Sequence, residues 1–360
     1  MGLDSEGMTA ANIGQVAGRI VETDARAAAE AQRLLDAKTK PPRSLGRLED
    51  LVCQLAAIRG DATPPPRPAK AIVVMGADHG VAAEGVSAYP QEVTSQMLLN
   101  FARGGAAINV LARQAGARVV VVDMGVARPL APAPEIRACR IGAGTANLAR
   151  GPAMTRAQAL AALAAGAALA DELARDGVGL LGIGEMGIAN TTAASALAAV
   201  FTGAPPEEVT GRGTGIDDAT FRRKVDVVRR GIEINRPDAG DAVDALAKVG
   251  GFEIAGLAGV VLGAAAARLP VVVDGFIASV AALAAVRLAP LAAGYLIASH
   301  RSVETGHRLV LQALGARPLL DLDLRLGEGT GAALAMPLVD AALAIAAEMA
   351  TFESAGVSGG

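Results

Sequence analysis

Uninterrupted apolar runs that end in glycine and polar residues recur along the chain. Four of them read "KAIVVMGADHG" (70–80), "ARVVVVDMGV" (117–126), "VGLLGIGEMG" (178–187) and "LPVVVDGF" (269–276). Runs of this kind, without polar alternation, are typical of strands that are buried on both faces of a parallel sheet. We therefore predict four such strands, each followed by a loop that contains glycine and an acidic residue.

Alanine-rich stretches with helical spacing lie between these runs, for example at 155–176 and 281–289. Further helices are predicted at 16–38, in the segment directly after the proline-marked turn "KTKPPRSLG", and at 335–350. The repeated order of strand, loop and helix predicts an α/β protein with a Rossmann-like, doubly wound parallel sheet between two helical layers. The carboxyl ends of such strands meet at one edge of the sheet, where ligands bind.

The two ends of the chain are predicted to form a second, smaller unit. We assign 36–312 to a large α/β domain that binds nucleotide and base. Residues 1–35 and 313–352 are assigned to a small helical domain that carries the loop "RLGEGTG" (325–331), and 353–360 to a flexible tail.

Composition and charge narrow the class of protein. Apolar residues make up 52% of the chain and charged residues 19%, which predicts a folded protein with a sizeable core. A net charge of −3 and 2% aromatic residues disfavour nucleic acid as a partner. The apolar runs are interrupted by charged residues or histidine before about 18 residues, so we predict no membrane span.

The N-terminus shows no secretion signal. Cys53 and Cys139 have neither a CxxC neighbour nor a nearby histidine, so we expect reduced thiols in a cytoplasmic protein. The three histidines follow no HExxH or similar spacing, and we predict neither a metal nor a cofactor.

Two glycine-rich loops are candidate anion sites. In "GIGEMGIANTT" (182–192), the glycines allow close backbone approach after a strand, and the following helix start offers free N–H groups. An ordinary strand-to-helix turn is the alternative, against which Glu185 inside the loop argues. After "TGRGTGIDD" (210–218), Arg212 and Lys224 could bind a monophosphate, or Lys224 could belong to a solvated helix face.

Three other motifs carry chemical groups. Asp78 and His79 end the first strand and are interpreted as hydrogen-bonded structural residues. "ASHRSVETGH" (298–307) holds serines, histidines and a glutamate, but no GxSxG motif supports a hydrolytic triad. In "RLGEGTG", Glu328 stands between two glycines, where a phosphate-binding loop would avoid a carboxylate.

Seven ordered motifs together resemble the nicotinate-nucleotide:dimethylbenzimidazole phosphoribosyltransferase family of cobalamin biosynthesis. They are "KPPRSLGRLE", "ADHGV..EGVSAYPQEVT", "GIGEMGIANTT", "TGRGTGIDD", "VVVDGFIAS", "SHRSVETGH" and "PLLDLDLRLGEGTGAALAMPLVDAA". The resemblance implies a homodimer and a pentosyl transfer from nicotinate mononucleotide to 5,6-dimethylbenzimidazole. The products would be α-ribazole 5′-phosphate and nicotinate.

The resemblance also implies roles for individual residues. Glu328 would be the general base, and Glu185 would lie near the ribose. Leu326 and the helix after the loop would shield Glu328 and raise its pKa. The other substrate-binding residues that the motifs imply are Gly187, Asn190, Thr191 and Thr192 near the phosphate, Lys224, Asp274, Ser302 and Arg325 in the same cleft, and Gln96, Met186, Leu326, Ala88 and Tyr89 around the acceptor base.

The sequence departs from the family pattern at a few positions. Arg43 replaces a glycine in "KPPRSLG", "SVETGH" replaces "SAEPGH", and Ala189 replaces a glycine in the expected phosphate loop, which affects the expected phosphate contacts. Two other functions stay open from the residues alone. One is transfer to another base, such as a purine or a phenol, and the other is a nucleotide-binding regulator without catalysis. A dinucleotide oxidoreductase is disfavoured because no GxGxxG follows the first strand.

Overall fold

The computed structural model describes residues 10–128, 130 and 133–358 and contains one six-stranded, fully parallel sheet. Its strands are β1 (Ala69–Ala77), β2 (Ala117–Gly125), β3 (Ile136–Ala138), β4 (Val178–Met186), β5 (Val271–Val273) and β6 (Leu296–Ala298). The order β3-β2-β1-β4-β5-β6 is that of a Rossmann-like, doubly wound sheet. The predicted fold class is confirmed.

The four apolar runs form β1, β2, β4 and β5, but β3 and β6 were missed. The missed strands are "IRA" and "LIA". β5 is equally short, but its three consecutive valines are typical of a buried strand, whereas the other two have no such run. The strand order reverses between β1 and β4. This reversal opens a crevice at the carboxyl edge of the sheet, between two neighbouring strands.

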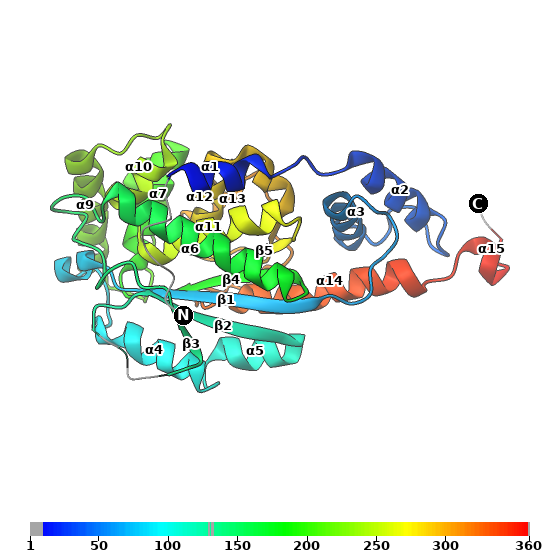
Figure 1. The fold of residues 1–360 in the computed structure, drawn as a ribbon, viewed down its shortest axis with the longest axis horizontal. Coiled ribbons are helices and arrows are strands. Elements are labelled where there is room, and N and C mark those ends of the chain that lie inside the picture. The colour runs from blue at the N-terminus through cyan, green and yellow to red at the C-terminus, as the bar shows by residue number, and fades with distance from the viewer. Residues whose placement is uncertain (1–9, 129, 131–132, 359–360) are drawn as a thin grey trace.

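Helices cover both faces of the sheet (Figure 1). One face carries α1 (Ala10–Gly18), α6 (Arg156–Arg175), α7 (Asn190–Thr202), α10 (Ala242–Val249), α11 (Phe252–Ala266) and α12 (Phe276–Leu288), and the other carries α3 (Arg47–Arg59), α4 (Glu92–Ala102), α5 (Ala107–Ala115) and α14 (Thr330–Glu348). Successive residues of β1 alternate between the two cores: Val73 joins the first, whereas Ile72 and Val74 join the second.

The remaining elements are short or peripheral. They are α2 (Ala25–Asp36), η1 (Gly80–Glu84), α8 (Pro206–Val209), α9 (Asp218–Asn235), η2 (Pro290–Tyr295), α13 (His307–Ala313) and α15 (Phe352–Ala355). The predicted helix at 16–38 is two helices. The chain leaves α1 after Gly18, and Asp24 starts α2 by accepting the N–H groups of Arg26 and Ala27 at 2.8 and 3.1 Å.

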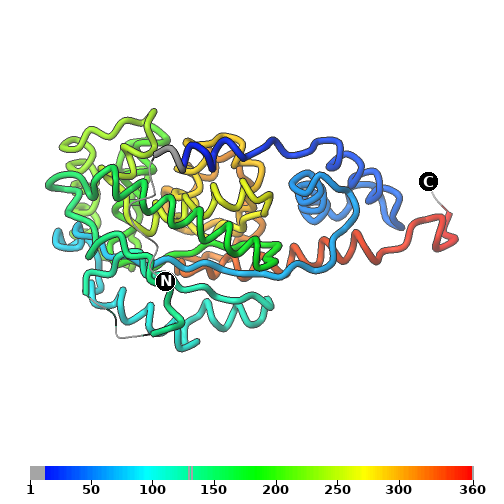
Figure 2. The backbone as a smooth tube through the Cα atoms, in the orientation of Figure 1, coloured from blue at the N-terminus to red at the C-terminus, as the bar shows by residue number. Residues whose placement is uncertain are grey.

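Segments from the two ends of the chain lie side by side (Figure 2). Lys38 and Thr351 form an antiparallel bridge, and the N–H of Phe352 donates to the carbonyl of Ala37 at 3.1 Å. Helix α3 packs against α2 and α14, while α1 packs against α6 and α11. The proposed limits of the two domains stay a prediction, and α15 occupies the beginning of the segment assigned to the tail.

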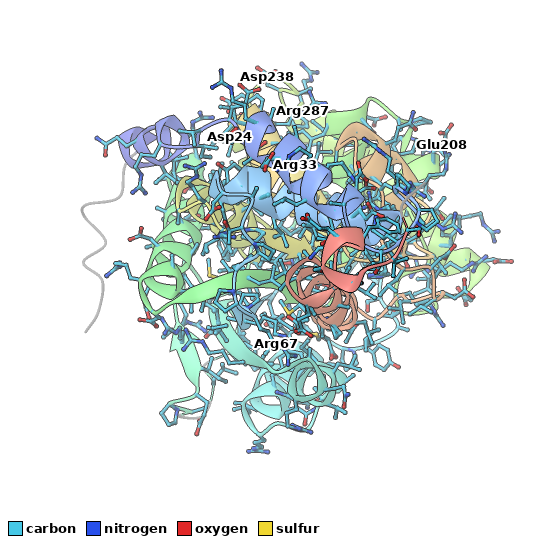
Figure 3. All side chains as sticks on the ribbon, turned by 90° about the vertical axis from the view of Figure 1, so that its right-hand side faces the viewer. Asp24, Arg33, Arg67, Glu208, Asp238 and Arg287 are labelled. Carbon is cyan, nitrogen blue, oxygen red and sulfur yellow. The ribbon has the colours of Figure 1, made fainter. Side chains whose placement is uncertain are left out.

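Helices α6 and α14 are long and apolar enough to cross a membrane by length and composition alone. About half of each is buried inside the fold, where α6 packs against α11 and α14 packs against α5 and α3. Arg67, which is labelled in Figure 3, pairs with Asp340 of α14 at 2.6 Å. Both helices therefore have partners within the fold, as core helices do.

The contact between α6 and α11 depends on the absence of side chains at glycine positions. A Cβ atom on Gly259 would lie 1.9 Å from the carbonyl oxygen of Leu163, and one on Gly166 would lie 1.8 Å from that of Gly256. The obstructing atoms belong to backbone, so neither helix can yield without moving as a whole. These glycines let two apolar helices approach closely over the sheet.

We expect Gly259→Ala to destabilise the protein by about 1–3 kcal/mol, because the added methyl group must push α6 and α11 apart. Gly14→Ala is the matched control, since a Cβ at Gly14 in α1 meets nothing within 4 Å. It should stabilise the protein by up to about 1 kcal/mol through helix propensity. Urea unfolding of both variants measures the difference, and equal effects would contradict the packing argument.

Candidate active site

A cavity of about 480 Å³ lies at the carboxyl edge of the sheet, beside the reversal between β1 and β4. Its walls come from the loops after β4, β5 and β6, the loop at 86–89, the loop at 213–214 and the segment 323–327. The size is typical of a small-molecule site. The predicted site residues that line it are Tyr89, Glu185, Met186, Gly187, Asn190, Thr191, Ser302, Arg325 and Leu326.

Glu185 is the next-to-last residue of β4 and lines this cavity. Its side chain is buried, and one carboxylate oxygen accepts a hydrogen bond from the side-chain amide of Asn190 at the start of α7. Burial raises the pKa of Glu185 to about 8, against an opposing effect of Asn190, and the nearby carboxylates of Glu253, Asp274 and Glu328 raise it further. An empty site therefore holds Glu185 largely protonated at neutral pH.

The turn from β4 into α7 brings backbone close to the end of β1. A Cβ atom on Gly187 would lie 2.6 Å from the carbonyl oxygen of Ala77, so only glycine fits there. Ala189, the predicted departure from the family pattern, precedes α7 with a φ of +72°. This left-handed conformation is the one that a glycine adopts without strain, and alanine adopts it here at a cost.

Lys224 of α9 reaches the beginning of α7 from below the cavity. Its Nζ donates to Thr191 Oγ1 at 2.8 Å and to the carbonyl of Gly211 at 3.1 Å, and the residue is 1% exposed. Burial lowers its pKa to about 8, and Glu304 acts in the opposite direction. The interpretation of Lys224 as part of a solvated helix face is therefore wrong, although Lys224 is not itself a lining residue.

Arg212 does not join Lys224. Its guanidinium lies over the ring of Phe221, pairs with Asp218 and donates to the carbonyl of Ile216 at 2.9 Å. These contacts hold the side chain on the exposed outer side of the loop. The expected pairing of Arg212 and Lys224 around a phosphate is not present in the structure.

The "GEG" turn has an uncommon backbone. Gly327, Glu328 and Gly329 have φ values of +85°, +63° and +89°, so three successive residues are left-handed. The two glycines adopt this region freely, whereas Glu328 adopts it under strain of the kind found at functional sites. The turn packs against β4 at Gly184, where a Cβ atom would lie 2.2 Å from the amide nitrogen of Gly329. The bare surface of β4 thus lets the turn lie directly on the sheet.

Glu328 is held against Glu185 by backbone. Its N–H donates to the carbonyl of Glu185 at 3.2 Å, and the residue is 6% exposed. Its Oε2 finds no hydrogen-bond partner within the described residues. Burial raises the pKa of Glu328, while the N–H of Ile108 at the start of α5 lowers it. Glu328 itself does not line the cavity, whose wall ends at the neighbouring Gly327.

The expected cause of this raised pKa needs a correction. Leu326 is 56% exposed and forms part of the cavity wall, so it does not cover Glu328. The left-handed turn reverses the chain and directs consecutive residues to different sides. The burial of Glu328 instead comes from its place beside β4 and the start of α5.

Asp274 follows β5 and caps α14. Its two carboxylate oxygens accept the N–H groups of Gly329 and Gly331 at 2.9 and 2.7 Å. The helix has no side-chain cap of its own, and an anion at this end is favoured by the helix dipole. Asp274 does not line the cavity, contrary to expectation, because its carboxylate is turned toward the helix.

Three other predicted residues also lie outside the cavity wall: Gln96, Ala88 and Thr192. Gln96 is on the exposed side of α4. The N–H of Ala88 donates to Thr214 Oγ1 at 3.1 Å, which joins the two loops at the cavity rim. Thr192 is fully buried within α7, near the helix start. Motif matching places these residues near the site but does not give their orientation.

Sequence reasoning did not assign several lining residues, among them His300, Glu304 and Asp323. The motif "SHRSVETGH" was recognised, but only Ser302 was taken from it. His300 and Glu304 would have been found by treating every polar residue after a strand as a candidate. Asp323 has a φ of +54°, a backbone feature that leaves no signal in the sequence.

In the described part of the chain, no three His, Cys, Asp or Glu side chains gather as a metal site would require. The fully buried pair His79 and Glu253, 2.7 Å apart, lies behind the cavity. This contact agrees with the hydrogen-bonded structural role expected for His79.

A doubly wound sheet with a cavity at its reversal, two buried carboxylates and a buried lysine beside a helix start defines a nucleotide-handling α/β enzyme. The family model described as "Phosphoribosyltransferase" matches residues 20–357. The chain belongs to the nicotinate-nucleotide–dimethylbenzimidazole phosphoribosyltransferase family, as the motifs predicted, and is a phosphoribosyltransferase.

Relatives that carry this family name cover nearly the whole chain. One from Desulforamulus reducens is 52% identical over 97% of this chain and 99% of its own length. One from Chloroflexus aggregans is 57% identical over 96% of this chain and 97% of its own length. A crystal structure of the enzyme from Thermus thermophilus superposes with a TM-score of 0.88 at 50% identity, covering 94% of this chain and all of that one.

We expect Glu185→Gln to stabilise the protein increasingly as the pH rises. The folded-state pKa of Glu185 is about 8 against 4.5 for the ordinary side chain, so the folded state holds a proton that the unfolded state releases. Wild-type stability therefore falls between these two values, and glutamine removes that loss. Urea unfolding from pH 4 to 9 measures it. A constant difference between the variants would show that Glu185 ionises normally.

Proposed function

We propose that this chain transfers the 5-phosphoribosyl group of nicotinate mononucleotide to 5,6-dimethylbenzimidazole, giving α-ribazole 5′-phosphate and nicotinate for the lower ligand of cobalamin. The observation that carries the proposal is the "GEG" turn, whose backbone holds the buried Glu328 next to Glu185 and adjoins the cavity wall at Gly327. The family names given above support the two substrates. We also propose a cytoplasmic homodimer.

The transfer needs a base rather than an acid. One benzimidazole nitrogen attacks C1′ of the ribose while the bond from C1′ to the nicotinate nitrogen breaks. The ring bound to the sugar would become cationic unless the other nitrogen loses its proton. Glu328 has a free, buried oxygen to accept that proton. Nicotinate leaves with the electron pair of the broken bond as a neutral pyridine ring, so no group need protonate it.

Glu185 stabilises the positive charge of the nicotinate ring and of C1′. The substrate brings a pyridinium, and the ribose gains positive character at C1′ in the transition state. A carboxyl that is protonated in the empty site is drawn toward its ionised form by a nearby cation. The resulting carboxylate stabilises the developing charge in a cavity wall that excludes water. Asn190 orients the group by its hydrogen bond.

The phosphate would bind between α7 and Lys224. The N–H groups of Asn190 and Thr192 already donate to backbone carbonyls. The hydroxyl of Thr191, the Lys224 ammonium and the dipole of α7 would therefore hold the phosphate. A dianionic phosphate would restore the ordinary, higher pKa of the buried lysine. The side chain is already held by two hydrogen bonds, so little ordering accompanies binding.

We expect Glu328→Gln to lower kcat roughly 100- to 10,000-fold, because glutamine cannot take up the benzimidazole proton. Incubation with nicotinate mononucleotide and dimethylbenzimidazole, followed by mass detection of α-ribazole phosphate, measures the rate. Glu348→Gln, at the exposed far end of the same helix, is the matched control and should retain the wild-type rate.

A Glu328→Gln variant with wild-type turnover would contradict the general-base role. Adenine and a phenol, offered in place of dimethylbenzimidazole, separate this reaction from transfer to another acceptor. A wild-type chain that binds the nucleotide and forms no product with any of the three acceptors would support the non-catalytic regulator instead.

We expect Lys224→Met to raise the KM for nicotinate mononucleotide roughly 10- to 100-fold, through loss of a charge-assisted hydrogen bond to phosphate. Nicotinate riboside, which lacks the phosphate, is the matched ligand. Its turnover should be equal in the two proteins. An equal loss for both ligands would show that Lys224 supports the fold of the site and not the phosphate.

A further inference from the structure

His300 lines the cavity, and the proposed reaction does not use its chemistry. It follows β6, is 2% exposed and lies between the end of β5 and the start of α14. A Cβ atom on Gly331 would lie 1.9 Å from Nδ1, and one on Gly275 would lie 3.5 Å from Nε2. The ring is therefore fixed in orientation by the backbone on both of its sides.

The Nδ1 side of the ring faces protein. Nδ1 lies 3.0 Å from Ser299 Oγ and 3.7 Å from Asp274 Oδ1. Ser299 Oγ also lies 3.2 Å from the carbonyl of Asp274, which can only accept, so both contacts are satisfied when the hydroxyl donates to that carbonyl. The hydroxyl oxygen can then accept a hydrogen bond, and the neighbouring carboxylate also favours a proton on Nδ1. These contacts assign the proton of the neutral ring to Nδ1.

The Nε2 side of the ring is left as a hydrogen-bond acceptor. Burial lowers the pKa of His300 to about 4, so the ring is neutral at physiological pH and Nε2 carries a lone pair. Within the described residues Nε2 makes no hydrogen bond, while the ring borders the cavity next to Gly275. Nε2 is thus an acceptor that is open to the cavity and can take a hydrogen bond from a donor on the ligand.

His307 provides an internal comparison. Its Nδ1 accepts the N–H of Ser302 at 2.9 Å, and its Nε2 lies 3.0 Å from Ser279 Oγ. Both nitrogens are thus satisfied by protein, and the ring does not line the cavity. The two rings lie 6.2 Å apart, but of the two only His300 offers a nitrogen to a ligand.

We propose that His300 binds a ribose hydroxyl of the nucleotide substrate by accepting its hydrogen bond at Nε2. This inference rests on the proposed function. Phosphate and the nicotinate carboxylate offer no proton to such an acceptor at neutral pH, whereas the 2′- and 3′-hydroxyl groups do. His300, whose Nδ1 lies beside the Asp274 carboxylate that caps α14, would then fix the sugar next to the start of that helix. His300 is in this account a positioning residue that aligns C1′ with the acceptor base.

Two variants distinguish the contributions of Nδ1 and Nε2 of His300. In His300→Asn, the amide replaces the Nδ1 contacts with Ser299 and Asp274 but leaves nothing at the Nε2 position. In His300→Gln, the longer side chain places an amide oxygen near the former Nε2. We expect Asn to weaken nicotinate mononucleotide binding roughly tenfold, as the loss of one buried hydrogen bond does, and Gln to restore part of it.

Calorimetric titration of the substrate and of its 2′-deoxy and 3′-deoxy analogues, without an acceptor base, is the test. The loss caused by His300→Asn should disappear for the analogue that lacks the bound hydroxyl. An equal loss for all three ligands would show a purely structural role and would overturn the inference. So would unchanged binding of the substrate. A wild-type chain that does not convert nicotinate mononucleotide would overturn the proposed function itself, which the product assay detects separately.

Discussion

The cap that Asp274 forms on α14 connects the sheet to the chemistry. A carboxylate at the end of β5 accepts two N–H groups from the first turn of a helix that is formed by residues more than 50 positions later. Those N–H groups adjoin the "GEG" turn, so the same contact that starts the helix also fixes Glu328. The neighbouring part of the cavity wall depends on where the "GEG" turn lies, because the turn packs on β4 next to Glu185.

Burial of several carboxyl groups at one edge of a sheet is unfavourable for folding and useful for catalysis. Glu185, Asp274 and Glu328 all have raised pKa values, chiefly because water has been removed from them. The protein compensates with backbone N–H groups, one side-chain amide and the ends of two helices. A substrate that brings a pyridinium supplies the missing positive charge. The same buried carboxyl groups that make folding less favourable thus make the site suitable for a cationic ligand.

The sequence allowed four of the six strands and the "GEG" turn to be recognised, but not the orientation of side chains. Composition identifies a nine-residue apolar strand such as β1, and even the three valines of β5, but not three mixed residues such as the "LIA" of β6. The strand-to-helix pattern brought Glu185 and Asn190 to one edge, because β4 ends there. Glu328 follows no strand and was assigned through the family resemblance alone. The sequence did not show that Asp274 turns away from the cavity, since that depends on which N–H groups lie within reach.

The same limit explains His300. A histidine after a short strand is most often a satisfied structural residue, and His307, seven positions further on, is one. His300 differs from His307 because of the hydroxyl proton of the neighbouring Ser299. Because Ser299 donates it to the carbonyl of Asp274, the imidazole must donate from Nδ1 and therefore accepts at Nε2. The hydrogen bond of Ser299 thus determines whether His300 can accept a hydrogen bond from a ligand, although Ser299 does not contact that ligand. This hydrogen bond exists only in the folded arrangement of β5, β6 and α14.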